Sequence, residues 1–348
     1  MSLRACALRA IAKNPALSFA SIDEALLVSL PSSLKLDIIK SLSISAGWVD
    51  DVLPLTFFAK LPLRALSFSA CSTLSAAYII AVARAVPALR GLDLTSCFYV
   101  GDADVVELLR LLPNLRYLCL CDCRRLTTIT TDALVRFGGS LRHVDIGGCG
   151  SLSRADVCTF LARHPAAADF RGLGLSGTEG LDDEAMRIIG ARFRRLTRLS
   201  AGYYRGTEAT LIAAIVANQS TLVSLDLHWP RALSDEVALA LTTADRFGEL
   251  RFLNVQGVKG MSLDGLCAIL NVHPRPAGFT ATPSWDAIDW LEWCTIIADS
   301  AAATVPTFVD ALGQGIALIS CRFSGLESNG LVGVRAHISS QAMAVKTE

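Results

Sequence analysis

The chain lacks an excess of charge of either sign, because its 348 residues include 32 Lys and Arg against 32 Asp and Glu. A molecule with zero net charge has no general attraction for nucleic acid or for an acidic membrane surface, so we expect neither as a partner. Charged residues are only 18% of the chain and hydrophobic residues are 52%, which excludes an intrinsically disordered protein. The composition therefore predicts a folded protein.

Long apolar runs and a secretory leader are missing as well. The most apolar late stretch, residues 301–321, is interrupted by Pro306, Asp310 and Gln314, so it falls short of the roughly 20 residues that a membrane span needs. We find no opening apolar segment with a small-residue cleavage site, and the eleven Cys are an odd number, so a secreted disulfide scaffold is disfavoured. We expect a cytoplasmic or nuclear protein with reduced thiols.

The first 22 residues carry a different signal. Arg4, Arg9 and Lys13 stand among Ala, Leu and Ser, with no acidic residue before Asp23, which is a composition typical of a mitochondrial transit peptide. An ordinary N-terminal helix explains the same residues. A mitochondrial location is therefore the minor alternative.

A repeated motif dominates the sequence. Four segments share the pattern Leu-Arg-x-Leu-x-Leu-x-x-Cys, with conservative apolar changes, and they begin 26 residues apart at Leu63, Leu89, Leu115 and Leu141. Four later copies follow at intervals of 26 to 29 residues and begin at Phe170, Leu196, Leu222 and Leu250. In place of the ninth-position Cys they carry Thr178, Tyr204, Pro230 and Val258. Eight copies that agree in period and in apolar positions indicate a repeat architecture.

Each copy predicts one strand and one helix. Alternating apolar residues at the fourth and sixth positions favour a strand with one buried face, and the segment 100–112 that follows places Val105, Leu108, Leu109 and Leu112 on one helical stripe. Stacking of eight such units predicts an α/β solenoid over residues 63–271, with a parallel concave sheet and outer helices. We expect the strands near residues 65–69, 91–95, 117–121, 143–147, 171–175, 197–201, 223–227 and 252–256.

The motif Leu-x-x-Leu-x-Leu-x-x-Cys at this period resembles the cysteine-containing leucine-rich repeat of the ribonuclease-inhibitor-like superfamily. Many proteins of this subtype are F-box/leucine-rich-repeat receptors, in which the horseshoe holds a target and an N-terminal F-box joins a cullin ubiquitin ligase. The resemblance implies a non-catalytic protein-interaction module without a cofactor, and a substrate-recognition subunit of a cullin-type ligase, acting in ubiquitin-dependent protein catabolism, is the first hypothesis. A scaffold or inhibitor without a ligase link and an organellar assembly component are the alternatives.

Residues 1–62 are predicted to form an N-terminal helical cap, since any solenoid needs its apolar end covered. Part of this segment is similar to the opening helix of an F-box, and the residues that would bind a cullin adaptor are Leu30, Pro31, Leu34, Ile38 and Leu42. Only 20 residues separate this element from the first repeat, too few for the rest of the F-box pattern. The segment Ser2 to Ile11 is similar to an elongin-binding box, with one residue of difference in its spacing. Adaptor binding is a second use that the same surface could serve.

The third, fifth and seventh positions of each copy are predicted to face the concave side, where a protein target would bind. The candidate binding residues are Tyr117, Cys119, His143, Asp145, Arg198, Asp226, His228 and Phe252. Tyr117, His143 and Arg198 are the expected anchors, because Tyr and Arg dominate interface energetics. The pairs His143–Asp145 and His228–Asp226 also invite a catalytic or metal interpretation, but no motif places a nucleophile beside either His. We therefore predict no catalytic residues and no metal ligands.

The repeated cysteines are predicted to be structural. Cys71, Cys97, Cys123 and Cys149 all occupy the ninth position, so they would stack in a row beneath the strand-to-helix turn, whereas metal ligands must converge. Cys119 and Cys121 occupy concave positions, so we expect exposed thiols there.

A row of arginines occupies the second position of six copies, namely Arg64, Arg90, Arg116, Arg142, Arg171 and Arg251. Each follows the helix of the preceding unit, whose terminal carbonyls carry partial negative charge, so we expect each Arg to cap a helix. The competing interpretation is a stripe that grips an acidic partner or phosphate.

The repeat pattern ends after Leu270, which places a boundary between residues 271 and 272. Residues 272–348 are predicted to hold a C-terminal cap, built around Trp285, Trp290 and Trp293, and a tail whose last ten residues are disordered. An exposed aromatic anchor for a partner is the alternative role of the three Trp. Residues 301–348 show no period from which we can assign structure.

Overall fold

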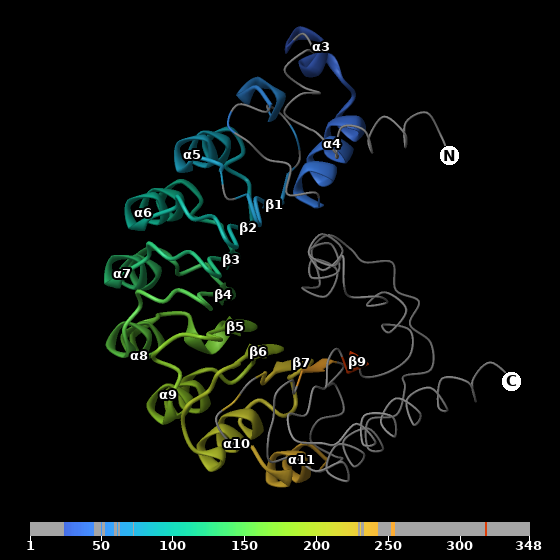
Figure 1. Cartoon of the computed structure of the whole chain (residues 1–348). Coiled ribbons are helices and arrows are strands. Elements are labelled where there is room, and N and C mark those ends of the chain that lie inside the picture. Colours follow the sequence, from blue (N-terminus) through green and yellow to red (C-terminus); the bar gives the residue numbers. More distant parts are fainter. Residues whose placement is uncertain are drawn as a thin grey trace, which may run out of the picture.

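A computed structural model describes residues 24–44, 50, 53–58, 61, 63–71, 73–228, 230, 233–242, 252–254 and 317–318. Within these residues nine strands form one sheet, ordered as in the chain, and every neighbouring pair is parallel. The strands line the inner side of an arc and the helices form its outer side (Figure 1). The chain therefore folds as an α/β solenoid with a parallel concave sheet and outer helices, as the repeat predicts.

The strands are shorter than the five residues expected, and eight of them cover only the third to fifth positions of a copy. They are β1 (Ala65–Ser67), β2 (Gly91–Asp93), β3 (Tyr117–Cys119), β4 (His143–Asp145), β5 (Gly172–Gly174), β6 (Arg198–Ser200), β7 (Ser224–Asp226), β8 (Phe252–Asn254) and β9 (Ala317–Leu318). The outer helices are α5 (Ala76–Ala85), α6 (Asp102–Leu111), α7 (Thr128–Phe137), α8 (Arg154–Arg163), α9 (Asp183–Arg192), α10 (Glu208–Val216) and α11 (Asp235–Thr242).

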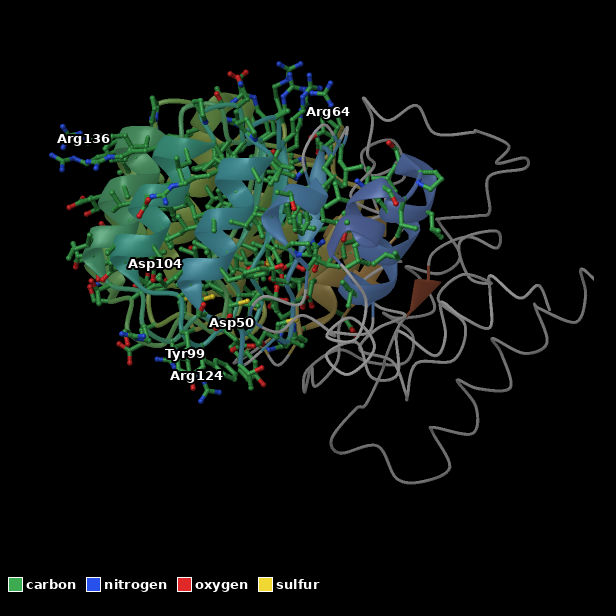
Figure 2. The ribbon with its side chains drawn as sticks, turned by 90° about the horizontal axis from the view of Figure 1, so that it is seen from above. Asp50, Arg64, Tyr99, Asp104, Arg124 and Arg136 are labelled. Atoms are coloured by element: carbon green, nitrogen blue, oxygen red, sulfur yellow. The ribbon has the colours of Figure 1, made fainter. Side chains whose placement is uncertain are left out.

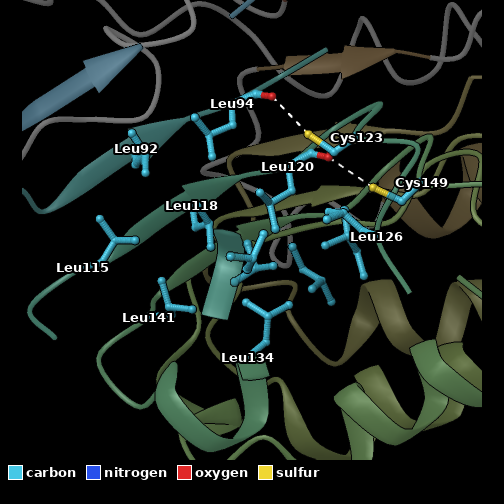
Figure 3. Packing of buried hydrophobic residues seen from close by; sticks show 14 of the residues in the cluster. Leu92, Leu94, Leu115, Leu118, Leu120, Cys123, Leu126, Leu134, Leu141 and Cys149 are labelled. Atoms are coloured by element: carbon cyan, nitrogen blue, oxygen red, sulfur yellow. Dashed lines mark hydrogen bonds between the residues drawn. The ribbon is translucent and has the colours of Figure 1, made fainter. Parts of the chain in front are cut away.

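The core is built from positions that recur in every repeat. Leu66, Leu92, Leu118 and Val144 occupy the fourth position, pair with one another in the sheet register and are buried. Sixth-position side chains such as Leu94 and Leu120 are also buried and lie beside them, further along the chain (Figure 3). The stripe predicted on α6 is confirmed, since all four of its side chains are at most 3% exposed. Stacking therefore joins the repeats into one continuous apolar core.

The ninth-position cysteines are buried and structural, as predicted. The Sγ of Cys97 donates to the Phe68 carbonyl at 3.2 Å, and the Sγ of Cys123 and of Cys149 donate to the carbonyls of Leu94 and Leu120, each at 3.1 Å (Figure 3). Each thiol thus satisfies the sixth-position carbonyl of the preceding repeat. Because a small weak donor fits this gap below the turn, Cys serves where a larger polar side chain would not.

The N-terminal end of the solenoid is covered by the helices α3 (Glu24–Ser29) and α4 (Ser32–Ile44) and the 3-10 turn η1 (Leu55–Phe58) (Figure 1). The side chains of Ile38, Leu42, Phe57 and Phe58 join the buried cluster that continues into the first repeat. The described part of residues 24–58 is therefore helical and packs against the first repeat. No helix among the described residues has both the length and the apolar character needed to cross a membrane.

The far end of the sheet differs from expectation. Residues 301–348 carry no repeat motif, so the sequence gives no strand there, yet β9 pairs in parallel with β8 through Ala317 and Leu318. The edge strand of a sheet has unpaired N–H and C=O groups that can pair with any extended segment, so the repeat motif is not required for this pairing. The three Trp and the end of the chain lie outside the described residues.

Candidate functional site

The concave face carries one row of large side chains at the third position. Tyr117 on β3 pairs in register with His143 on β4, which pairs with Gly172 on β5, which pairs with Arg198 on β6. The Tyr117 and His143 rings lie 5.8 Å apart between centroids. The structure therefore brings the three predicted anchors into one row, with a glycine between the second and the third.

Two glycines of β5 make room for the side chains of β4. A Cβ on Gly172 would lie 2.3 Å from the His143 Nδ1, and a Cβ on Gly174 would lie 2.2 Å from the Asp145 Cγ. Real Cβ atoms do not approach other atoms this closely, so any larger residue would push His143 and Asp145 away from the sheet. The sequence shows both glycines at concave positions, but nothing in the repeat motif reveals that they support their neighbours.

Burial and charge set the ionisation of this row. Burial, together with the charges of Arg198 and Arg171, lowers the pKa of His143 to about 4, so the imidazole is neutral at pH 7. Burial raises the pKa of Asp145 above its usual range, while the Arg198 charge acts in the opposite direction. The positive charge of Arg198 therefore acts on the pKa of both His143 and Asp145.

A second polar cluster lies along β5, β6 and β7. The Nδ1 of His228 lies 2.7 Å from the Asp226 Oδ1, and the Ser200 hydroxyl donates to the other Asp226 oxygen at 2.9 Å. Burial alone would raise the pKa of Asp226, but the hydrogen bonds and charge of His228 and the bond from Ser200 lower it below its usual value. The Tyr203 ring packs edge-on against His228, with 5.1 Å between centroids.

This second cluster does not have the order of a catalytic triad. In a triad the base lies between the nucleophile and the acid, whereas here the Ser200 hydroxyl bonds to the carboxylate directly. Ser200 is also 2.7 Å from the Ser176 hydroxyl, which accepts from the Gly202 N–H. The contacts form a polar network that ties three strands together.

The concave row is shallow. The space bounded by Tyr117, His143, Asp145 and Arg198 is about 10 Å³, whereas pockets for small organic ligands hold roughly 300 Å³ or more. Among the described residues no three His, Cys, Asp or Glu side chains gather as metal ligands would. The geometry of the row suits contact with another macromolecular surface.

The expectation of exposed thiols at Cys119 and Cys121 is wrong. Cys119 is 5% exposed and its Sγ lies 3.0 Å from the Thr95 hydroxyl, while Cys121 is half-buried. Burial raises the pKa of both thiols, Asp145 raises each further, and thiolate formation is disfavoured. Flanking side chains on strands about 4.8 Å away cover a residue as small as Cys.

The remaining predicted residues have these positions. Asp226 and His228 are half-buried in the network described above, and Phe252 lies on β8 opposite Ser224, with its side chain outside the described part of the structure. Pro31 is exposed and Leu30 and Leu34 are half-buried, but Ile38 and Leu42 are 3% and 0% exposed, within the cap.

Arg142 donates to carbonyls after the preceding helix, as predicted, whereas Arg171 donates to a carbonyl after the following helix, α9. The Arg142 guanidinium donates to the Gly139 carbonyl at 3.2 Å and to the Leu141 carbonyl at 2.8 Å, just after α7, and Arg171 donates to the Arg195 carbonyl at 3.3 Å. Arg142 also lies 3.7 Å from Asp169. Arg251 lies outside the described residues.

The sequence matches no protein-family model and no curated protein. Several solved structures are similar in fold. A chain of the yeast Rad7 and Elc1 complex is 15% identical with a TM-score of 0.33, and the match covers 76% of this chain and 96% of that one. The leucine-rich repeat-containing protein LegL7 from Legionella pneumophila is 18% identical with a TM-score of 0.40, covering 84% and 96%. A Bacteroides fragilis protein is 14% identical with a TM-score of 0.39, covering 60% and 63%.

Proposed function

We propose that this chain is a non-catalytic protein-interaction module that holds a protein partner on its concave face. The observation that carries the proposal is the row formed by Tyr117, His143 and Arg198, three large side chains held in register on a rigid sheet above a space too small for a small-molecule ligand. Side chains of this kind in a preformed surface bind with little ordering cost. Tyr and Arg are also the residues most enriched among interface anchors.

The test compares two triple-alanine variants of the full chain. The site variant carries Tyr117→Ala, His143→Ala and Arg198→Ala, and the matched control carries Asp132→Ala, Arg163→Ala and Arg187→Ala, which are exposed positions on outer helices. Truncating a buried anchor commonly costs about 2 kcal/mol or more, so the site variant should bind the main co-purifying protein at least tenfold more weakly. The control should bind as the wild type does.

Affinity purification with quantitative mass spectrometry identifies the partner, and titration calorimetry then measures its affinity. Retention of full affinity by the site variant, together with a loss in the control, would place the interface on the outer helices and overturn the proposal. Equal thermal unfolding of the two variants establishes that any difference arises at the surface.

The finer proposal is that the bound protein is a substrate and that the chain is the recognition subunit of a cullin-type ubiquitin ligase. Its support is the similarity of residues 30–42 to an F-box opening helix, of which Pro31 is exposed and Leu30 and Leu34 are half-buried. A scaffold or inhibitor without a ligase link would use the same concave face and leave this end of the solenoid without a partner.

Two substitutions on α4 distinguish binding of a cullin adaptor from a structural role in covering the solenoid. Leu34→Glu changes a half-buried residue at the surface of α4, whereas Ile38→Glu buries a charge inside the cap and should unfold it. If the chain is a ligase receptor, the Leu34→Glu variant stays folded but loses co-purification of a cullin adaptor. Absence of any cullin adaptor from the wild-type purification would leave the scaffold role.

A further inference from the structure

We infer that the chain has a second binding site, separate from the concave row, that takes a small soluble molecule bearing several phosphate groups. The site is a pocket of about 370 Å³ lined by Arg64, Arg90, Arg116, Arg142, Asn114 and Ser140, named here the arginine pocket. In Figure 2 Arg64 and neighbouring guanidinium groups project from one edge of the solenoid, whereas Tyr99 and Arg124 lie at the opposite edge. The volume is within the range of pockets that hold small ligands.

The backbone fixes the spacing of the four arginines. The N–H of Arg90 donates to the Arg64 carbonyl, that of Arg116 to the Arg90 carbonyl and that of Arg142 to the Arg116 carbonyl, each at 2.7 Å. Since neighbouring strands lie about 4.8 Å apart, the row is held at about 14 Å over its three steps. The positions of the side-chain roots are therefore set before a ligand arrives.

Helix capping does not balance the charge of this row. The pocket adjoins the C-terminal ends of α5, α6 and α7, through residues 88, 114 and 139–140. Each helix end supplies about half a negative charge, so three ends offset roughly 1.5 of the four guanidinium charges. Asp169 beside Arg142 is 53% exposed and offsets part of the rest. No described residue lining the pocket is acidic.

The charge density and the spacing favour phosphate over carboxylate. A guanidinium group binds phosphate through two parallel N–H bonds, and one phosphate brings up to two negative charges where a carboxylate brings one. An extended acidic peptide would place same-side carboxylates about 6.7 Å apart, which does not match steps of about 4.8 Å. A compact molecule with three or more phosphates engages the whole row, and Asn114 and Ser140 add neutral donors. An inositol polyphosphate and a nucleoside triphosphate both have this chemistry.

Titration calorimetry with the full chain tests the site, using inorganic tripolyphosphate as the probe. The pocket variant carries Arg90→Ala and Arg116→Ala, and the control carries Arg163→Ala and Arg187→Ala, which remove the same charge from the outer helices. We expect saturable binding to the wild type, a loss of at least tenfold in affinity in the pocket variant, and a change of less than twofold in the control. Should the pocket variant fail to fold, Arg116→Lys keeps the charge but loses the two-pronged donor, and it should still weaken binding about threefold.

Two further ligands identify the source of the phosphates. If inositol hexakisphosphate binds more tightly than tripolyphosphate, the ligand is an inositol polyphosphate. If ATP binds more tightly than tripolyphosphate, the ligand is a nucleoside triphosphate. Absence of saturable binding, equal losses in the pocket variant and the control, or tighter binding of a glutamate-rich peptide of equal charge would each overturn the proposal. The concave row is unchanged in every variant, so these outcomes are independent of partner capture there.

Discussion

The eighth position of the repeat requires an unusual backbone conformation. Its backbone is left-handed in the six repeats whose eighth position the structure describes, with φ between 59° and 73°, at Ala70, Ser96, Asp122, Gly148, Gly177 and Tyr203. The conformation lets the chain leave the sheet while its N–H still pairs with the next repeat, as the Ser96 N–H does with the Cys121 carbonyl at 2.8 Å. Only glycine adopts this conformation without cost, so four of the six residues are held there by the surrounding repeats.

Opposite substitutions at this position should have opposite effects. Gly148→Ala should lower the free energy of unfolding by about 1–3 kcal/mol, because φ is positive and a Cβ would lie 2.2 Å from the Asp122 Oδ1. Ser96→Gly should be neutral or stabilise by up to about 1 kcal/mol, since it relieves a left-handed residue. Chemical denaturation of both variants measures this. Equal destabilisation by the two changes would show that the turn conformation is not what they alter.

His164 should make the stability depend on pH. The side chain is fully buried against Phe160 and Phe170, and this burial lowers its pKa to about 4. Between pH 6.5 and 4 the unfolded chain binds a proton at this residue and the folded chain does not, so stability falls as pH falls through that window. We expect a loss of roughly 1–2 kcal/mol between pH 7 and 5 from this residue.

The variant His164→Asn isolates that contribution, because its side-chain oxygen can still accept the Ala166 N–H that now bonds to the His164 Nδ1 at 3.2 Å. Denaturation curves at pH 7, 6 and 5 should show a shallower decline for the variant than for the wild type. Parallel declines would mean that His164 is protonated equally in the folded and unfolded states.

At the scale of helices and strands, carboxylates at the starts of several outer helices join one repeat to the next. Asp102, at the first turn of α6, accepts the Thr127 N–H at 2.9 Å and the Thr130 hydroxyl at 2.6 Å, both at the start of α7. Asp183 on α9 accepts the Thr207 N–H at 2.7 Å before α10, and Glu208 accepts the Ser234 N–H at 2.7 Å before α11. These contacts link neighbouring helices in the way that the ninth-position thiols link neighbouring strands.

Removing one of these links should destabilise the array. Burial alone would raise the pKa of Asp102, but hydrogen bonds from Thr127 and Thr130 lower it below its usual value. Asp102→Ala leaves the buried Thr130 hydroxyl without this acceptor, so the free energy of unfolding should fall by about 2–4 kcal/mol. Asp132→Ala, an exposed carboxylate on α7, is the control and should change it by less than about 0.5 kcal/mol. If Asp102→Ala and Asp132→Ala changed the stability equally in thermal or chemical unfolding, Asp102 would not be a stabilising link between repeats.

The repeat motif predicts the elements well because one residue type recurs at one place in each unit. Leucines at the fourth and sixth positions can be buried together only if the strands stack in parallel, and the sheet does have this register. The site is less predictable, because it depends on contacts between units. The burial of Cys119 beside Thr95, the space that Gly172 leaves for His143, and the pairing of β9 all arise from neighbours that no motif specifies.

At the scale of the whole molecule, the solenoid presents two separate surfaces from one regular array. Third-position side chains form the concave row, and second-position arginines, one residue earlier in each repeat, form the pocket at the edge of the sheet. Both are held by the same backbone ladder, so neither needs to fold when a ligand binds. A rigid array of this kind suits recognition, and specificity is set by which side chains occupy each repeat.

The most direct measurement of the concave interface is hydroxyl-radical footprinting of the chain alone and in complex with its captured partner, because it needs no substitution. We predict that oxidation of Tyr117 and His143 falls at least severalfold in the complex. Oxidation of Tyr99, which is 56% exposed and lies at the edge of the solenoid in Figure 2, should be unchanged. Protection of Tyr99 with unchanged oxidation of Tyr117 and His143 would contradict the account and place the partner on the edge of the solenoid.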